Sequence, residues 1–214
     1  MTKAKFNQIK KFFSQFPSKK YHKGQLILKP GDIFENVYFI KSGFVRAYTT
    51  TPKGENTINL FRPLFYFSLI HFISEHRNDY YFETITPVEV YVVPFSEYKK
   101  FTATDKNITP AIMDLFFGSL MNLFVNQGNI VCGCSKNKVA SILLQLTHDY
   151  GELKNNKLVV NFPATHRIIA NLIGLTRETT SVQMSKLQKR GIISTKRTQF
   201  TVNDLEKLKK IAQS

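Results

Sequence analysis

The segment 165–190 constrains this chain more than any other part of the sequence. Apolar residues at helical spacing predict a first helix that ends at Gly174, and they are Ile168, Ile169, Leu172 and Ile173. After a short turn, Thr176 opens a second helix, whose first turn carries Arg177, Glu178 and Thr180. Two short helices joined by a tight turn form a helix-turn-helix, and the second helix of that motif enters the major groove of DNA.

The charge of the chain favours a polyanionic partner. Its 214 residues hold 30 Lys and Arg against 15 Asp and Glu, and the formal net charge is +15 at pH 7. Residues 136–214 hold 14 of the basic residues against 5 acidic ones, whereas residues 1–135 hold 16 against 10. The denser positive charge therefore lies in the part that contains the helix-turn-helix, and double-stranded DNA is the expected partner.

Composition and hydropathy indicate a folded protein outside the membrane. Hydrophobic residues make up 43% of the chain, which is enough to form a core. The two cysteines, Cys132 and Cys134, are too few for a disulfide framework or a four-thiolate cluster and fit a reducing compartment. The apolar run 64–73 is about half a membrane span, and no secretory-type apolar run occurs in residues 1–30. We therefore expect a cytoplasmic protein with no membrane partner.

Residues 21–95 show the pattern of many short strands separated by turns, preceded by a short helix at 4–16. The predicted strands are 26–28, 37–40, 44–49, 56–61, 80–86 and 88–93. The turns between them include ProGlyAsp at 30–32, LysSerGly at 41–43 and ProLysGlyGlu at 52–55. Strands at a spacing of about ten residues predict an antiparallel barrel or jelly roll.

The segment 109–131 predicts one long helix with two adjacent apolar stripes. One stripe contains Met113, Phe117, Leu120, Phe124 and Val131, and Gln127 interrupts it. The other contains Ile112, Phe116, Leu123 and Ile130. A helix that is apolar over so wide an arc buries two surfaces, so we expect the first stripe to pair with a second copy and form a homodimer. The alternative is that both stripes pack within one copy.

CysGlyCys at 132–134 interrupts the helical pattern and is predicted to be a hinge. The elements expected beyond it are a helix at 136–150 capped by Gly151, a strand at 158–162, the helix-turn-helix, a two-stranded wing at 192–202 and a last short helix from Asp204. The fold class is therefore α+β. Its three predicted parts are a β-barrel at 1–108, a dimerisation helix and hinge at 109–135, and a winged helix-turn-helix at 136–214.

The order of these parts resembles the Crp/Fnr family of bacterial transcription regulators, whose N-terminal domain is a cyclic-nucleotide-binding-like jelly roll. The most specific match is LeuIleGlyLeuThrArgGluThrThrSer at 172–181. GlyGlnLeuIleLeuLysProGlyAsp at 24–32 and TyrPheIleLysSerGlyPheValArg at 38–46 resemble the first strands of such a barrel. The resemblance spans almost the whole chain. It implies a homodimeric, sequence-specific transcription regulator that binds a palindromic operator, with RNA polymerase as a further partner.

The resemblance also implies which residues contact DNA. Arg177 and Glu178 would reach base edges, because Arg pairs with guanine O6 and N7 and Glu accepts from the cytosine amino group. Thr180 and Ser181 would add smaller contacts, including one to a thymine methyl group. Phosphate contacts are expected from Thr165, Arg167, Thr176, Thr179, Lys196 and Arg197, with Thr165 and Thr176 also capping the two helices. Lys186, Lys189 and Arg190 lie further along and are expected to contact the DNA backbone or remain solvated.

One position departs from the family pattern. Many relatives carry a second base-reading Arg five residues after the first, and this chain has Val182 there. A valine can touch a thymine methyl group but cannot read guanine. We therefore expect an operator that differs from those typical of the family.

The barrel also departs from relatives that bind a cyclic nucleotide. Those relatives hold the ribose with a GlyGlu pair and the phosphate with an Arg followed by Ser or Thr. PheSer at 67–68 stands where GlyGlu is expected, and AsnAsp at 78–79 stands where the Arg pair is expected. Arg77 is one residue out of place, and Asp79 would repel a phosphate. We therefore expect no cyclic-nucleotide cofactor.

Apolar and aromatic residues replace that cassette, and they are Phe65, Tyr66, Phe67, Leu69, Ile70, Phe72, Ile73, Tyr80, Tyr81 and Phe82. They favour a filled core. The alternative is a pocket for an apolar ligand or haem, so the sequence does not decide whether the barrel binds a ligand. His71, His76 and Cys132 are the candidate haem or metal ligands. A histidine beside an apolar run is more often structural, so no metal site is expected. Cys132 and Cys134 are expected to be inert, because two thiols one residue apart strain a direct disulfide, and a redox switch is the alternative.

No Ser/His/Asp or Cys/His constellation occurs at a useful spacing, and no phosphate-binding loop occurs. Catalytic residues and enzymatic activity are therefore not expected, although a barrel-based enzyme or ligand-binding protein is the rival of a different class. Within the DNA-binding class, two functions remain. Either the barrel controls the DNA-competent arrangement of the dimer, or the protein binds DNA constitutively and its sensor is vestigial.

Overall fold

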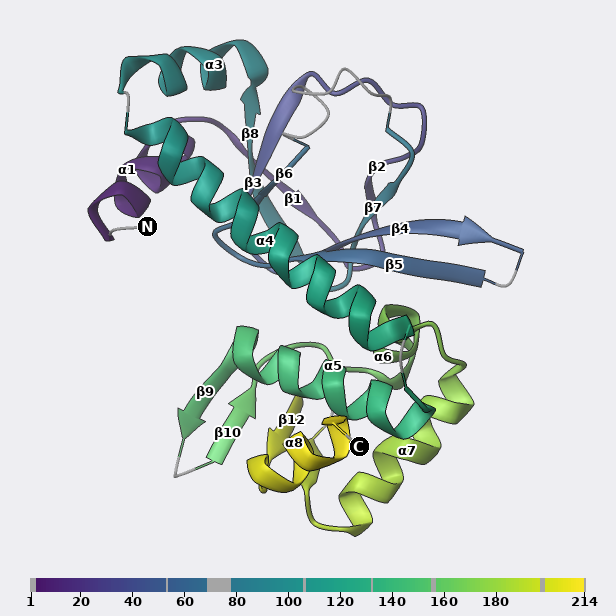
Figure 1. Cartoon of the computed structure of the whole chain (residues 1–214). Helices are drawn as coiled ribbons and strands as arrows, with labels where there is room; N and C mark the ends of the chain where they lie inside the picture. Colours follow the sequence, from purple (N-terminus) through teal and green to yellow (C-terminus); the bar gives the residue numbers. More distant parts are fainter. Residues whose placement is uncertain are drawn as a thin grey trace. The chain divides into compact units, whose positions relative to one another are not determined.

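The computed structural model describes residues 3–52, 54–68, 78–105, 107–131, 133–154, 157–196 and 199–213. The chain folds into two compact units, residues 1–121 and 122–214. The first unit is built mainly from strands, and the second from helices with a small sheet (Figure 1). The division falls inside the long helix α4 (Ile108–Val131).

Two four-stranded antiparallel sheets form the barrel of the first unit (Figure 1). One sheet has the order β1-β8-β3-β6, with β1 at Ser18–Tyr21, β8 at Val88–Pro94, β3 at Asn36–Ser42 and β6 at Tyr66–Phe67. The other has the order β2-β7-β4-β5, with β2 at Leu26–Leu28, β7 at Tyr81–Thr84, β4 at Val45–Thr51 and β5 at Gly54–Phe61. Strands β4 and β5 form a long hairpin that pairs from Val45 with Phe61 to Thr51 with Gly54.

Strand β3 is buried on both faces, which explains its continuous apolar sequence. Ile40 belongs to the core inside the barrel, and Tyr38 packs against that core. Val37 and Phe39 belong to a second core, which includes residues of α1 (Lys3–Phe13), α3 (Phe95–Thr104) and the start of α4. The rings of Phe13 and Phe39 stack there with centroids 4.5 Å apart. Full burial of such a side chain contributes about 1.5–3 kcal/mol, so the helices are held firmly on the outside of this sheet.

The turn predicted at 41–43 is confirmed, and its glycine is required. Gly43 has a φ of 85°. A Cβ atom at this position would lie 2.2 Å from the carbonyl oxygen of Pro87. Any other residue would therefore strain the backbone and clash with it.

The second unit packs helices against a four-stranded antiparallel sheet of order β11-β12-β10-β9. Its helices are α5 (Ser135–Tyr150), α6 (His166–Ile173), α7 (Arg177–Lys189) and α8 (Leu205–Gln213). Its strands are β9 (Gly151–Lys154), β10 (Lys157–Val160), β11 (Ile193–Lys196) and β12 (Gln199–Val202). Its most deeply buried side chains, each at most 1% exposed, include Val139, Leu143, Ile169, Met184, Ile192 and Phe200.

The predicted α+β class and the order of barrel, long helix and winged helix-turn-helix are confirmed. Sequence analysis missed the strands β1, β6 and β9 and the helix α3. The first three residues of β1 are exposed, so its sequence shows no apolar alternation. The signal for α3 was present, because Phe95, Tyr98 and Phe101 follow Pro94 at steps of three residues.

Candidate nucleic-acid interface

The helices α6 and α7 are bounded by the residues that the sequence indicates. The Thr165 Oγ1 accepts a hydrogen bond from the backbone N–H of Ile168 at 3.2 Å, and the Thr176 Oγ1 accepts one from Thr179 at 3.1 Å. Both predicted N-caps are thus confirmed. Gly174 ends α6 in the left-handed conformation with a φ of 62°, as expected for a glycine that follows a helix.

Helix α7 is anchored through one face. Thr180, Met184 and Leu187 are 0%, 0% and 3% exposed, and their spacing of four and three residues places them on one side of the helix. Through this side α7 contacts both α5 and α6. On a neighbouring side, the Gln183 Nε2 donates a hydrogen bond to the Ser135 Oγ at 3.2 Å, which joins α7 to the start of α5. The helix is therefore fixed in place while its opposite side is left open.

The open side of α7 carries most of the predicted base-reading residues. Arg177 and Glu178 are exposed in the first turn, and Ser181 is half-buried in the second turn. Val182 is a large apolar residue that is 52% exposed. We call Arg177, Glu178, Ser181 and Val182 the reading face. It combines cation, carboxylate, hydroxyl and methyl groups, which are the groups that distinguish base edges in a major groove.

The prediction that Thr180 contacts DNA is wrong. Its side chain is 0% exposed, and its Oγ1 is buried and has no hydrogen-bond partner among the described residues. A side chain with no accessible surface cannot reach a base edge. Thr180 instead belongs to the anchoring side of α7. The signal that could have shown this is the apolar Met184 four residues later and Leu187 seven residues later.

The predicted phosphate contacts lie around this helix pair. Arg167 on α6 and Thr176 before α7 are exposed, whereas Thr165 and Thr179 are half-buried because their side chains take part in the caps. The backbone N–H groups of the first turn of α7 lie beside Thr176, and such groups bind phosphate oxygens at helix N-termini.

The wing is a β-hairpin that pairs Ile193 with Val202 and Lys196 with Gln199. Ile193 is 2% exposed and holds the base of the wing in the core, whereas Lys196 is exposed. A hydrogen bond from the Gln188 Nε2 to the Thr195 Oγ1 joins the wing to α7. The other predicted wing contact, Arg197, lies outside the described residues.

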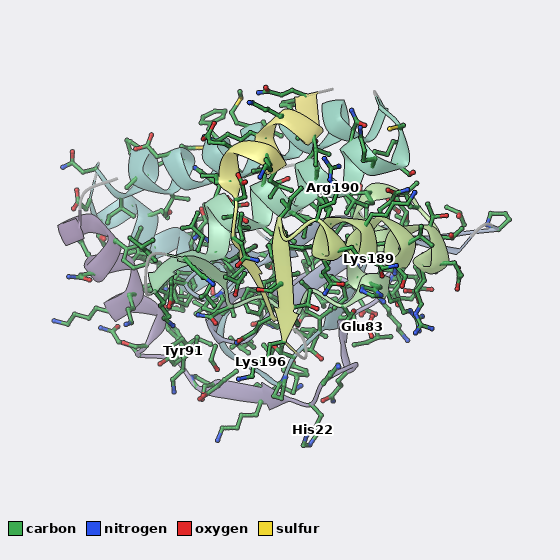
Figure 2. All side chains as sticks on the ribbon, turned by 90° about the horizontal axis from the view of Figure 1, so that it is seen from below. His22, Glu83, Tyr91, Lys189, Arg190 and Lys196 are labelled. Atoms are coloured by element: carbon green, nitrogen blue, oxygen red, sulfur yellow. The ribbon has the colours of Figure 1, made fainter. Side chains whose placement is uncertain are left out.

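The end of α7 adds further positive charge. Lys186, Lys189 and Arg190 are all exposed there. Figure 2 shows Lys189 and Arg190 at the end of the helix and Lys196 on the wing. The acidic residue of the first turn is Glu178, and the basic residues of the last turn are Lys186 and Lys189, an arrangement that also suits the helix dipole.

The long helix α4 shows which apolar side chains are left uncovered in one copy of the chain. Phe117, Met121 and Phe124 are 57%, 61% and 63% exposed. Of the other residues in the predicted dimer stripe, Met113 and Leu120 are half-buried, and the side chain of Val131 lies outside the described residues. Met121 was missed by sequence analysis, although it lies four residues after Phe117 and three before Phe124. We call Phe117, Met121 and Phe124 the exposed stripe.

The barrel residues at the cyclic-nucleotide positions serve the fold. Phe67 is 2% exposed and stacks on Phe82 with ring centroids 5.1 Å apart. Asn78 is 1% exposed, and its Nδ2 donates to the carbonyl oxygens of Lys29 at 2.6 Å and Tyr80 at 2.7 Å. Its Oδ1 accepts from the Tyr80 N–H at 2.9 Å. These hydrogen bonds satisfy both ends of the amide.

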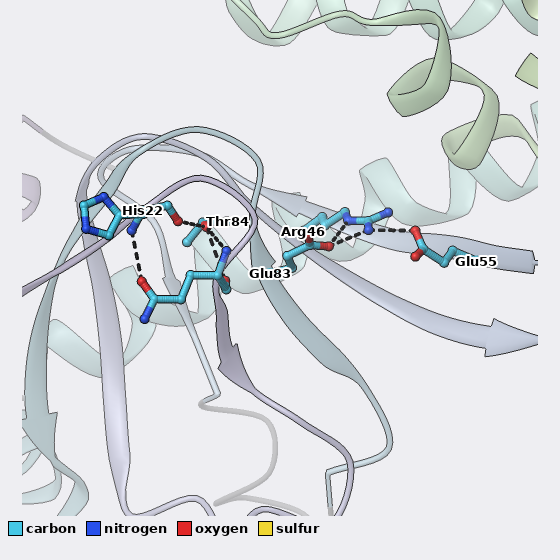
Figure 3. Close-up of polar contacts among 6 residues, drawn as sticks. His22, Arg46, Glu55, Glu83 and Thr84 are labelled. Atoms are coloured by element: carbon cyan, nitrogen blue, oxygen red, sulfur yellow. Dashed lines mark hydrogen bonds and ion pairs between the residues drawn. The ribbon is translucent and has the colours of Figure 1, made fainter.

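One buried ion network in the barrel was not anticipated from the sequence. The Arg46 side chain is 9% exposed, and its Nη2 lies 2.7 Å from a Glu55 oxygen and 2.5 Å from a Glu83 oxygen (Figure 3). The guanidinium also lies over the Tyr48 ring, 4.1 Å from its centroid. A buried cation needs such partners, because an uncompensated charge inside a protein is costly. The network therefore joins β4, β5 and β7.

The part of the chain that the structure describes holds no group of three or more His, Cys, Asp or Glu residues placed to bind a metal ion. The three candidate haem or metal ligands, His71, His76 and Cys132, lie outside the described residues. No described helix is both long enough and apolar enough to cross a membrane.

Two family descriptions match this chain. Residues 18–105 match "Cyclic nucleotide-binding domain", and residues 137–211 match "Crp-like helix-turn-helix domain". The first match covers most of the barrel, and the second covers the helix pair and the wing.

Whole-chain relatives agree with these matches. The fumarate and nitrate reduction regulatory protein of Yersinia pestis is 26% identical over 197 residues, which cover 91% of this chain and 78% of that protein. The global nitrogen regulator of Synechococcus elongatus is 23% identical over 186 residues, covering 86% of this chain and 84% of that protein.

Solved structures show the same fold. FixK2 from Bradyrhizobium japonicum matches with a TM-score of 0.79 at 21% identity, over 91% of this chain and 96% of that chain. A CRP/FNR-family transcriptional regulator from Thermus thermophilus matches with a TM-score of 0.71 at 23% identity, over 92% of this chain and 99% of that chain.

Proposed function

The chain belongs to the Crp/Fnr family of DNA-binding transcription regulators, and we propose that it acts as a homodimer that reads a two-fold symmetric operator. Its relatives are transcription regulators and not enzymes. The observation that carries the proposal is the reading face, which is open to solvent on a helix whose other side is anchored in the core. A regulator of this kind acts on the chromosome in the cytoplasm, and RNA polymerase is its proposed further partner.

The reading face supports specific base contacts. The guanidinium of Arg177 can pair with guanine, and the carboxylate of Glu178 can accept a hydrogen bond from a cytosine amino group. Val182 offers only methyl groups, which suit the methyl group of thymine. We therefore propose that each half of the operator contains a G·C pair read by Arg177 and Glu178 and a nearby T·A pair that contacts Val182.

The exposed stripe on α4 supports the dimer. Three large apolar side chains at helical spacing on the surface of one copy mark a binding site more often than a solvated face. Pairing two copies through α4 would bury these side chains. A dimer carries two copies of α7, and recognition helices that bind successive major grooves of one duplex lie about 34 Å apart.

The barrel supports a regulator that does not use a cyclic nucleotide. PheSer at 67–68 stands where relatives that bind a cyclic nucleotide are expected to carry GlyGlu; Phe67 fills space inside the barrel, and the Ser68 hydroxyl donates to the Asn36 carbonyl oxygen. Asn78 uses its amide on the backbone of Lys29 and Tyr80. The aromatic core of the described barrel favours a second candidate within the same class, a constitutive DNA binder. Comparing DNA affinity with and without cell extract separates this candidate from a regulator with another effector.

The test is selection of binding sites from random duplexes with the purified protein, followed by footprinting. We expect a symmetric protected stretch that holds two equivalent half-sites. A protein that enriches no sequence, or protects one half-site only, contradicts the proposed dimeric reader. Cyclic AMP is added as a separate arm, and a tenfold rise in affinity on its addition would contradict the proposed absence of a cyclic-nucleotide cofactor.

A further inference from the structure

A cavity of about 400 Å³ lies in the second unit, between the start of α5 and the C-terminal half of α7. Its lining includes Cys134, Lys136, Gln183, Lys186, Lys189 and Arg190. On α7, Gln183, Lys186 and Arg190 follow one another at steps of three and four residues and therefore share one side of the helix. That side differs from the reading face, so the cavity is a separate feature of the recognition unit.

The cavity is strongly basic. Among the described residues that line it, four are Lys or Arg and none is Asp or Glu. The N-terminus of the 16-residue helix α5 also lies at this cavity, and its first turn contains no acidic residue. The partial positive charge of a helix N-terminus thus adds to the four side-chain charges. An anionic group is the ligand that this arrangement favours.

A nucleophile lies among these charges. Cys134 is a free, exposed cysteine at the N-cap position of α5, and its thiol donates a hydrogen bond to the Oδ1 of Asn137 at 2.7 Å. The backbone N–H groups of Asn137 and Lys136 lower the pKa of the Cys134 thiol, and the charge of Lys136 lowers it further. A larger fraction of the group is then thiolate at neutral pH, and the thiolate is the reactive form.

We propose that Cys134 is a modification site for small disulfides that carry carboxylates, and that the anionic arm of the attached group occupies the basic cavity. The Cys134 thiol first loses its proton to solvent. The thiolate then attacks one sulfur of the disulfide, a new S–S bond forms to Cys134, and the old S–S bond breaks. The departing sulfur leaves as a thiolate with the electron pair of the broken bond. The Cys134 sulfur is oxidised and the departing sulfur is reduced, so the step needs no other reactant.

The modification would regulate the proposed DNA binding, and this consequence rests on the proposed function. An attached carboxylate would neutralise Lys186, Lys189 or Arg190, next to the duplex that α7 enters. Fewer cations would then be available to the DNA backbone, and DNA affinity falls when phosphate contacts are lost. A small thiolate that attacks the mixed disulfide would form a new disulfide with the attached group and release Cys134 as a thiolate, which frees these cations again.

The test measures reaction rates in the absence of DNA, so its outcome does not depend on the proposed function. The Cys132→Ser protein keeps Cys134 as its single cysteine. It is treated with dithiobis(nitrobenzoate), which is a dianion, and with dithiodipyridine, which is uncharged, and the released thiol is followed by absorbance. The quantity of interest is the ratio of the two rates, because general accessibility and thiolate fraction cancel in it.

Two charge-matched variants decide the result. The Lys186→Gln/Arg190→Gln variant removes two cations from the cavity, and Lys157→Gln/Lys210→Gln removes two exposed lysines elsewhere in the same unit. We expect the anion-to-neutral ratio to fall about fivefold or more in the first variant and to stay within about twofold in the second, as for electrostatic steering. Added salt should lower the ratio of the parent protein in the same way.

Three results would overturn the proposal: equal ratios in the two variants, a parent ratio no higher than that of a free cysteine derivative, or a Cys134 that reacts with neither reagent. The neutral reagent and circular dichroism report whether each variant is folded. If the cavity variant does not fold, the single variants Lys186→Gln and Arg190→Gln are compared with Lys157→Gln and Lys210→Gln in the same way.

Discussion

Replacing Thr180 with valine should stabilise the recognition unit and leave DNA recognition unchanged. The Thr180 Oγ1 is buried without a hydrogen-bond partner among the described residues, and a buried unsatisfied hydroxyl costs about 1–3 kcal/mol. Valine has the same branched shape and nearly the same helix propensity, so it removes the unpaired oxygen with little change in packing. We expect Thr180→Val to raise the free energy of unfolding by about 1–2 kcal/mol. In calorimetry a cooperative unit of this size gains about 4–8 °C in its midpoint per kcal/mol.

Thr147 provides the matched control. It is also a buried threonine in a helix of the same unit, but its Oγ1 donates a hydrogen bond to the Leu143 carbonyl oxygen at 2.6 Å. Thr147→Val should therefore lower the free energy of unfolding by about 1 kcal/mol, the net value of one hydrogen bond. The reasoning is refuted if Thr180→Val destabilises the protein as Thr147→Val does, because its hydroxyl would then have a partner. A loss of preference at one base pair in Thr180→Val would show that this residue does contact DNA.

Four further substitutions test the proposed DNA interface and the proposed dimer. Arg177→Ala should lose about 1–3 kcal/mol of binding free energy at one base-pair position and relax specificity there. Affinities for a panel of single-base operator changes measure this. An unchanged base preference would show that Arg177 does not read a base. Lys196→Ala should weaken binding to all DNA sequences alike and reduce the slope of log affinity against log salt concentration by about one or less. Titrations at several salt concentrations measure this slope. A loss of affinity that depends on the DNA sequence would argue against a backbone contact. Phe117→Asp and Phe124→Asp should each dissociate the proposed dimer by placing an unpaired charge in its interface. Sedimentation measures this, and a dimer that persists in both variants means that another surface pairs.

Local signals predicted the recognition unit well because its boundaries depend on neighbouring residues. Thr165, Gly174 and Thr176 each act on backbone groups within four residues, so their roles can be read from short segments. The strand β1 could not be found in this way. Its exposed residues pair with β8 about 70 positions later, as Ser18 does with Tyr91, and no local pattern encodes that partner.

In the candidate site too, residues whose exposure follows from local sequence were predicted correctly, and residues whose burial depends on tertiary packing were not. Arg177 and Glu178 lie in a first helical turn, where most side chains are open to solvent, and the prediction of their exposure needed little more than the helix boundary. The burial of Thr180 depends on which side of α7 packs against α5 and α6, and tertiary packing decides that. The basic cavity could not be predicted from the sequence either. Cys134 and Arg190 are far apart in the sequence, and only the packing of α5 against α7 places both at one cavity.

The two apolar stripes predicted on α4 differ in how far one copy of the chain covers their described residues. Ile112, the first residue of the other stripe, is 2% exposed and packs into the core with α1 and α3, so it is used within one copy. On the other side, Phe117, Met121 and Phe124 remain more than half exposed. Removing apolar surface from water contributes about 25 cal/mol per Å², so any partner that covers these three side chains gains free energy from each of them. A second copy of α4 presents the same three groups in return, and an isologous contact uses each of them twice.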